Sequence, residues 1–536
     1  MSMESVSKKP VEKRKKAAVK PVEKWGPGRS GERLLLACMI ALFVSVCGII
    51  FLFTKAFFHS DSAFYVQLAL EQIKSGKLFP PGMCYSTVLF VRSPNLLLIP
   101  ILKVIKDWMI AREIMVVVMW IILILATMYC FMPKKDRNLA AAVIACMLLM
   151  NPYQTADVAN ETTDMLFFQG AYLTIFFDIV MTLGIMHRII LLDERDNKKY
   201  KVFLEILLAV VLFFPLLGSI RMDMILTLPL AASILIFYFL EYDQKLSRVL
   251  KSKRCMITVI LIMVVVAVGF VCYRRLSVMY WNDSKGSYLK MDKYSGLWHS
   301  IGQFVSNLLV AGVFIACNQW APRYLLSIYL DDILLFAVLL SEYMKKRERL
   351  TAVCAGLLIV MYCAFCHVYF WGHYKDKIGV DPSEELVSFL DEHDLHYGYA
   401  SFWNASVNSV LSSGKVIVLP TRDYDAENGK RKAYNPSDYR HWLLNERWYD
   451  PAAHPGKCFV LLKNFAVDDE KNREQWIKDH GDDPENPWID PTPPEDICEE
   501  FYTLNPQKLE CGDYTILVFE DNEELRALGN EIKGAK

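Results

Sequence analysis

A single carboxylate, Asp61, follows the first long apolar run of the chain and opens a mostly polar stretch that continues to about Trp108. An aspartate in such a position could deprotonate an acceptor hydroxyl as a general base. A structural role is the alternative, because Ser60 and Asp61 precede an apolar-periodic run and would cap a helix well. The residue types alone leave both interpretations open.

Four further side chains lie on the same side of the expected membrane spans as Asp61 and could share its chemistry. Asp164 opens a later apolar run, where it could act as a second acid or as a plain helix cap. An arginine can hold phosphate oxygens in a bidentate manner and stabilise a departing phosphate, or it can pair with an acid or a lipid head group. The arginines in suitable positions are Arg92, Arg112 and Arg221.

His59, Asp61 and Glu71 raise the question of a metal site. Two neighbouring residues and one distant glutamate do not make a coordination set with a recognisable spacing. We therefore predict no cofactor and no metal ligands, although a divalent ion is chemically conceivable beside these acids.

The distribution of apolar residues predicts a multi-pass membrane protein. Hydrophobic residues make up 54% of the 536 residues, and they gather in long runs before about Trp371. A run of about 20 apolar residues crosses the hydrocarbon layer as a helix. We expect a transmembrane domain over residues 34–371, with a large first loop over 54–110. The formal net charge is zero, so it gives no argument for a nucleic-acid partner.

Nine spans are expected, and basic residues orient them. The tail over residues 1–33 is rich in Lys and Arg, which places it in the cytoplasm and the C-terminal domain outside the cell membrane. Residues 93–106 suit a helix lying in the membrane interface. Residues 297–316 are apolar but carry polar side chains, so we expect an interfacial or re-entrant helix there. The expected spans are 34–53, 114–132, 139–150, 165–186, 203–217, 224–239, 257–272, 325–340 and 353–370.

Residues 381–536 have the composition of a small soluble α/β domain. The pattern predicts helices over 382–391 and 522–532, and buried strands over 415–419, 458–462 and 514–519. Cys498 and Cys511 could form a disulfide if this domain faces an oxidising compartment. The domain contains neither a phosphate-binding glycine loop nor the ligand spacing of a zinc site.

A pattern of small, aromatic and turn residues follows the first apolar run: Asp61, Ala63, Tyr65, Ala69, Gly76 and Phe79-Pro80. It resembles the first extracytoplasmic loop of GT-C glycosyltransferases, which include protein O-mannosyltransferases and aminoarabinose transferases. Two shorter runs, Thr162–Leu166 and Ala111-Arg112, are similar to runs that open spans in members of this superfamily. Many members have Asp-Glu where this chain has Asp61-Ser62, so the acidic residue directly after the aspartate is missing here.

The resemblance implies an α-helical polytopic fold and an inverting sugar transfer. The donor would be a polyprenyl-phosphate-linked sugar in the membrane lipid, and the acceptor an extracytoplasmic glycan, lipid or protein. Asp61 and Asp164 would be the catalytic carboxylates, with Asp61 as the general base, and Arg221, Arg112 and Arg92 would bind the donor phosphate. Members that use monophosphate donors generally need no divalent ion.

Two other functions remain open from the sequence. The chain could transport or flip lipid-linked sugars, or it could be a non-catalytic cell-envelope protein that binds a polymer. Transporters usually lack a large loop after the first span and a globular C-terminal domain. The presence of both features favours an enzyme.

Single cysteines introduced into a cysteine-free background will test the predicted topology. Sites in residues 1–33 and next to Lys134 should react only after the membrane is permeabilised, whereas sites in the C-terminal domain should react with an impermeant thiol reagent in intact cells. A C-terminal domain that is labelled only from the cytoplasmic side would contradict the nine-span topology.

Overall fold

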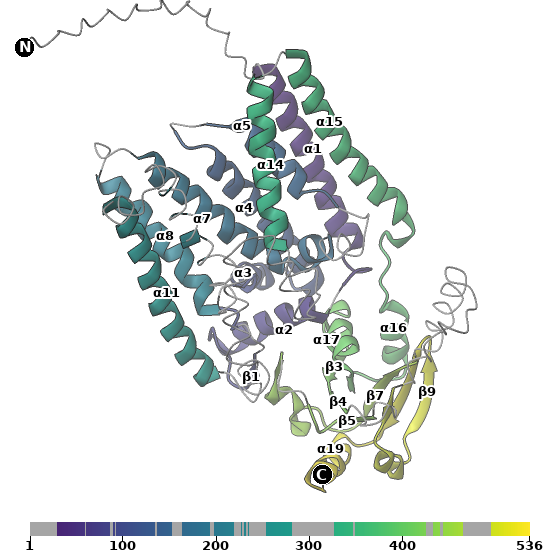
Figure 1. The fold of residues 1–536 in the computed structure, drawn as a ribbon. Coiled ribbons are helices and arrows are strands. Elements are labelled where there is room, and N and C mark those ends of the chain that lie inside the picture. Colours follow the sequence, from purple (N-terminus) through teal and green to yellow (C-terminus); the bar gives the residue numbers. More distant parts are fainter. Residues whose placement is uncertain are drawn as a thin grey trace, which may run out of the picture.

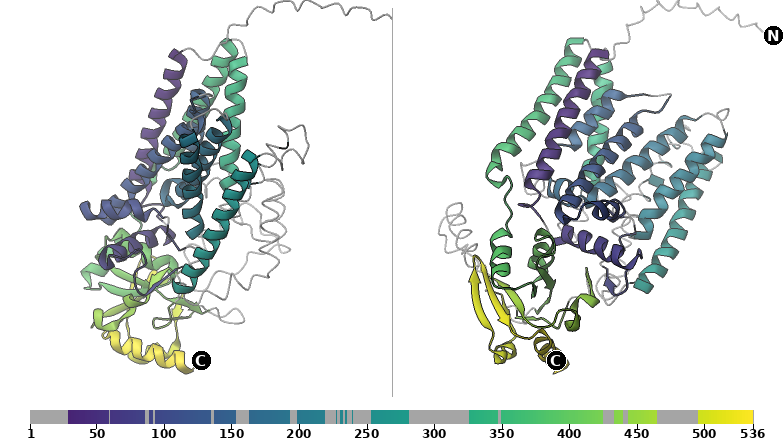
Figure 2. Two further views of the ribbon diagram at one scale, coloured as in Figure 1. Left: turned by 90° about the vertical axis from the view of Figure 1, so that its left-hand side faces the viewer. Right: turned by 180° about the vertical axis from the view of Figure 1, so that it is seen from behind.

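The computed structural model shows a helical bundle that carries a strand-containing domain at one end (Figure 1). The helices of the bundle lie roughly parallel, and the C-terminal domain covers the end where the first loop begins (Figures 1 and 2). The structure describes residues 29–58, 60–85, 89–91, 93–134, 137–152, 163–192, 198–218, 227, 230–231, 234, 239, 253–280, 326–346, 349–424, 433–439, 443–464 and 495–535.

Within those ranges, six helices are long and apolar enough to cross a membrane. They coincide with six of the expected spans, and their length and composition support a membrane protein. Their outward faces expose large apolar side chains such as Val44, Phe214, Val264 and Leu358, as contact with lipid requires. The six helices are α1 (Arg29–Phe53), α4 (Trp108–Phe131), α7 (Ala171–Leu191), α8 (Lys198–Gly218), α11 (Lys253–Tyr280) and α15 (Arg349–His373).

Two of the expected spans have a different form. Residues 139–150 form α5 (Leu139–Leu149), which rises only about 16 Å at 1.5 Å per residue. Its side chains from Ala140 onward are buried against α1, α4 and α14 (Leu326–Lys346), so α5 is an internal helix of the bundle. Residues 325–340 correspond to α14, whose acidic and basic residues set it apart from the six apolar helices.

The expected continuous span over 165–186 is broken near its start. Asp164–Gln169 form a short π-helix, η1, and Gly170 then adopts a left-handed backbone with φ +70° before α7 begins. Gly170 also lies against Val116 of α4, where a Cβ atom would come within 3.0 Å. The break lets η1 turn away from the axis of α7. All of 297–316 and most of 224–239 lie outside the described residues.

The first loop is largely helical. It contains α2 (Ser60–Ser75) and α3 (Asn95–Val104), so the helix expected over 93–106 is present, with Pro100 inside it. Leu98 and Leu102 of α3 are buried, whereas Leu96 and Val104 are exposed. Such a divided face suits a helix lying along the edge of an apolar layer.

The C-terminal domain has a five-stranded sheet that confirms the predicted strands. Its order is β3-β2-β7-β10-β9; β2 pairs in parallel with β3 and β7, and β10 is antiparallel to β7 and β9. The helices are α16 (Glu384–Glu392), α17 (Phe402–Leu411) and α19 (Asn522–Ala535). The strands are β2 (Tyr397–Ala400), β3 (Ile417–Pro420), β7 (Cys458–Lys463), β9 (Gln507–Cys511) and β10 (Tyr514–Phe519).

The predicted option of a Cys498–Cys511 disulfide is wrong for this fold, because both thiols are free and buried. Successive residues of a strand point to opposite faces, so each face of the sheet has its own core. Cys498 belongs to the core that contains Tyr399 and Leu517, whereas Cys511 belongs to the core that contains Val518. The sheet therefore separates the two sulfur atoms.

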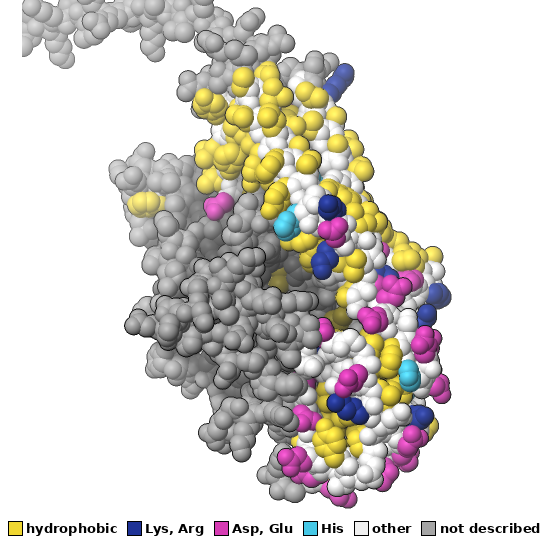
Figure 3. Space-filling model, turned by 90° about the vertical axis from the view of Figure 1, so that its right-hand side faces the viewer, with side chains coloured by type: hydrophobic (Ala, Val, Ile, Leu, Met, Phe, Trp, Pro, Cys, Tyr) yellow, Lys and Arg dark blue, Asp and Glu magenta, His cyan; other side chains and the backbone are white. Residues whose placement is uncertain are grey.

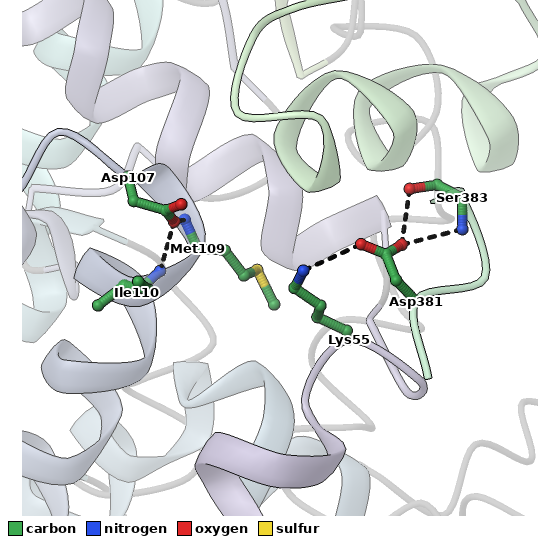
Figure 4. A network of polar contacts seen from close by, with 6 residues as sticks. All are labelled: Lys55, Asp107, Met109, Ile110, Asp381 and Ser383. Atoms are coloured by element: carbon green, nitrogen blue, oxygen red, sulfur yellow. Dashed lines mark hydrogen bonds and ion pairs between the residues drawn. The ribbon is translucent and has the colours of Figure 1, made fainter. Parts of the chain in front are cut away.

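Several contacts join the C-terminal domain to the bundle. The Lys55 ammonium group reaches the Asp381 carboxylate at 3.0 Å, and Asp381 also accepts hydrogen bonds from the backbone and the hydroxyl of Ser383 (Figure 4). Val410 and Leu411 of α17 belong to the core of the bundle. The space-filling view shows apolar side chains over the helical part and charged side chains mainly on the lower part, where the C-terminal domain lies (Figure 3).

Replacing Gly414 by alanine should lower the melting temperature of the protein. Gly414 has φ +79°, and a Cβ atom would lie 2.5 Å from the indole of Trp108 at the start of α4. The left-handed backbone alone costs an L-residue about 1–2 kcal/mol. Gly456, with φ +88° and nothing within 4 Å of its Cβ position, provides the control for that term. Equal losses for Gly414→Ala and Gly456→Ala would show that the contact with Trp108 contributes nothing.

Candidate functional site

Asp61 lies in the first turn of α2 and is half-buried. The negative charge is favourable there, because the amino end of a helix carries a partial positive charge. The Ser60 hydroxyl donates a hydrogen bond of 2.8 Å to the Trp403 carbonyl oxygen in α17. The start of α2, and with it Asp61, is therefore fixed against the C-terminal domain.

Tyr65 and Tyr172 share the surroundings of Asp61. Tyr65 is one helical turn beyond Asp61, so the two side chains lie on the same face of α2. Burial raises the pKa of Tyr65 above its ordinary value, and the charges of Asp61 and Tyr172 raise it further. The coupling to Tyr172 indicates that the start of α7 lies near Tyr65 of α2. Tyr65 remains a neutral hydroxyl at ordinary pH and can donate or accept a hydrogen bond.

Arg112 occupies the first turns of α4 and is almost completely buried, with 1% of its surface exposed. Its guanidinium carbon lies 4.8 Å from the centre of the Phe58 ring, a distance suited to a cation–π interaction. Phe58 follows the turn at the end of α1 and stands three residues before Asp61 in the chain. Arg112 therefore places a positive charge inside the bundle at the level where the first loop begins.

The helix that carries Asp164 meets the same region. Phe57 stacks on Phe168 of η1, with ring centres 4.9 Å apart, and η1 packs against α1, α2, α4 and α7. The structure thus brings together the elements that carry Asp61, Asp164 and Arg112. For Asp164 only the backbone is described, as the first residue of η1.

Arg92, Arg221 and His59 lie outside the described residues. The described segments that precede the two arginines are nevertheless joined. The backbone N–H of Leu89 donates to the Gly218 carbonyl at the end of α8, at 2.8 Å. The first loop is thus hydrogen-bonded to the end of α8. Each of the two bonded residues lies three positions before one of the arginines.

Three contributors were not expected from the sequence. The adjacent rings of Phe57 and Phe58 face η1 and Arg112, and Tyr172 follows the Gly170 break. The only local signals were an aromatic pair directly after an apolar run and a glycine within one. Neither signal indicates which distant element the ring will contact, because that depends on how the helices pack.

This arrangement can accept a proton and hold an anion. A carboxylate at the amino end of α2, a neutral tyrosine and a buried guanidinium lie at the end of the bundle that the C-terminal domain covers. Within the described part of the chain, no group of three His, Cys, Asp or Glu side chains could hold a metal ion. In comparisons with known proteins, no family model and no curated sequence matches the chain.

A double-mutant cycle will measure the contact between Arg112 and Phe58. Arg112→Met and Phe58→Leu each remove one partner, and a cation–π pair of this kind contributes about 0.5–2 kcal/mol. The double variant should therefore be more stable than the sum of the single effects predicts, by that amount, in unfolding measurements on the purified protein. Strictly additive effects would show that the stacking does not stabilise the fold.

Proposed function

We propose that this protein is a membrane glycosyltransferase of GT-C type that transfers a sugar from a polyprenyl-phosphate donor to an extracytoplasmic acceptor. The observation that carries the proposal is the convergence of α2, η1 and the start of α4 at one end of the bundle. These elements contain three of the five residues that the resemblance assigns to catalysis and donor binding: Asp61, Asp164 and Arg112. The lipid-exposed helices around them support a donor that arrives within the membrane.

The proposed orientation places this end of the bundle outside the cell and the basic tail in the cytoplasm. Basic side chains mark the opposite ends of the helices, as the positive-inside rule requires of a cytoplasmic face. Arg188 near the end of α7 stacks on Tyr129 near the end of α4, and Asn138 before α5 bonds to Ser341 of α14, so these ends lie together. The basic residues at this face include Arg33, Lys134, Arg188, Lys198 and Lys345. Because the C-terminal domain covers the proposed outer end of the bundle, this orientation makes that domain extracytoplasmic (Figure 1).

In the proposed reaction an acceptor hydroxyl oxygen attacks the anomeric carbon of the donor sugar. The bond from that carbon to the phosphate oxygen breaks, and the electron pair leaves with the polyprenyl phosphate. Asp61 takes the proton of the hydroxyl as general base. Because the hydroxyl oxygen attacks from the face opposite the departing phosphate, the configuration at the anomeric carbon is inverted. A guanidinium near the departing phosphate stabilises the developing charge, and Arg112, Arg221 and Arg92 are the candidates for this role.

Replacing Asp61 by asparagine tests the proposed base. Asparagine keeps the size of the side chain and removes only the favourable charge at the helix end, so stability should fall by about 0.3–1 kcal/mol at most. Sugar transfer from a synthetic polyprenyl-phosphate donor should fall by about 10²- to 10⁴-fold. Both quantities are measured on the same purified protein, by transfer kinetics and by a melting curve.

Asp107 provides the matched control. It caps α4, because its Oδ1 accepts hydrogen bonds from the backbone of Met109 and Ile110, both at 2.9 Å (Figure 4). Asparagine caps helices as well as aspartate does, so Asp107→Asn should leave transfer unchanged. Full transfer activity in Asp61→Asn would overturn the assignment of the base. Movement of the lipid-linked sugar across vesicles without any transfer would indicate a transporter instead.

A further inference from the structure

A short segment of the C-terminal domain, residues 444–448, is hydrogen-bonded to the carboxyl end of α2. The Glu71 carboxylate, in the last turns of α2, accepts two hydrogen bonds from this segment. Asn445 Nδ2 donates to one of its oxygens at 3.1 Å, and Trp448 Nε1 donates to the other at 2.9 Å. Because each oxygen has its own donor, the carboxylate is held in one orientation. Hydrogen bonds to an ionised acceptor are roughly twice as strong as neutral ones.

The same segment also binds the turn that follows α2. Met83–Cys84 form a two-residue strand, β1, which pairs with β6 (Leu444–Asn445) of the C-terminal domain. The backbone N–H of Glu446 donates to the Gly82 carbonyl at 2.9 Å. The amide of Asn445 is fixed in turn, because its Oδ1 accepts from the backbone N–H of Arg447 at 3.0 Å. The hydrogen bonds to Glu71 therefore come from a segment that is itself held in place by other hydrogen bonds.

We propose that Glu71 is a positioning residue through which the C-terminal domain holds α2, and with it Asp61, in the geometry that the site requires. This inference rests on the proposed function and gives the C-terminal domain a part in it. Glu71 stands ten residues after Asp61, about 15 Å along a rigid helix. The bond from Ser60 to Trp403 holds the other end of α2. With both ends bound to one domain, the helix can neither slide nor rotate against it.

The reason to expect a kinetic effect is the sensitivity of transfer reactions to geometry. A displacement of about 1 Å at the reacting groups can cost about 10²-fold in rate. Without the Glu71 carboxylate, the apolar contacts of α2 and the Ser60 bond would remain, but the far end of the helix would lose two directional contacts. Hydrophobic contacts are non-directional and do not replace them. We expect Glu71→Ala to lower kcat by about 10- to 100-fold per folded molecule. The KM for the donor should change little, because Glu71 does not touch the donor.

An exchange of hydrogen-bonding groups will separate positioning from general stability. In Glu71→Gln, an amide donor faces the fixed donor of Asn445, and in Asn445→Asp two carboxylates face each other. Each single variant should lower kcat. In the double variant, the glutamine amide can donate to the new aspartate while its carbonyl oxygen still accepts from Trp448, so kcat should return to within a few-fold of the natural protein. The exposed Glu531 of α19 gives the matched control, and Glu531→Gln should have no effect.

Hydrogen exchange of the α2 amides gives a second readout that does not depend on catalysis. Exchange over residues 61–75 should speed up in both single variants and slow again in the double variant. If the natural protein transfers no sugar, the proposed function fails, and this exchange pattern still tests whether Glu71 holds α2. Unchanged exchange in Glu71→Ala, or faster exchange together with a normal kcat, would overturn the positioning role. A double variant as impaired as the single variants would also overturn it.

Discussion

The position of helix α2 between two packed bodies is the constraint on which the candidate site depends. One face of α2 is buried in the core of the bundle through Ala63, Val66 and Ala69. Phe64 and Leu68 enter a separate cluster with Phe402 of the C-terminal domain. Burial of apolar surface on both sides stabilises the helix, although α2 is not itself one of the long apolar helices. The directional contacts at Ser60 and Glu71 then determine how the helix is oriented.

The bundle itself follows from the absence of water in the hydrocarbon layer. Each long helix satisfies its own backbone hydrogen bonds, and its outward side chains can remain apolar. α5 differs from the long helices because it is short and has no outward face. Its buried residues are mostly small or medium in size, such as Ala141, Ala142 and Ala145. Small side chains allow neighbouring helices to approach closely. A short helix can therefore fill the centre of the bundle without crossing the membrane alone.

A buried arginine lies on an aromatic ring at each end of this bundle. At the basic end, Arg188 has its guanidinium on the ring of Tyr129 and bonds the carbonyl of Gly184 at 2.9 Å. At the other end, the buried Arg112 lies on the ring of Phe58, close to the helix that carries Asp61. An aromatic face can accommodate a guanidinium in a place from which water is largely excluded. The Phe58 ring thereby accommodates the Arg112 cation inside the bundle, at the end where the candidate site lies.

The sequence by itself determined the membrane character of residues 34–371, the positions of six long apolar helices, and the main strands of the C-terminal domain. These features depend on local hydropathy and periodicity, which each segment carries on its own. The sequence also identified Asp61 as the first acid after the first span, and a helix beginning there was one of the two interpretations it left open.

Only the tertiary structure decided which residues meet. The break at Gly170, the internal position of α5 and the separation of Cys498 from Cys511 all follow from packing against distant segments. Glu71 and Trp448 are 377 positions apart, and nothing local to either residue predicts their hydrogen bond. The packing of η1 against α2 and α4 likewise depends on how whole helices are arranged, because spacing along the chain does not select the partners of a side chain.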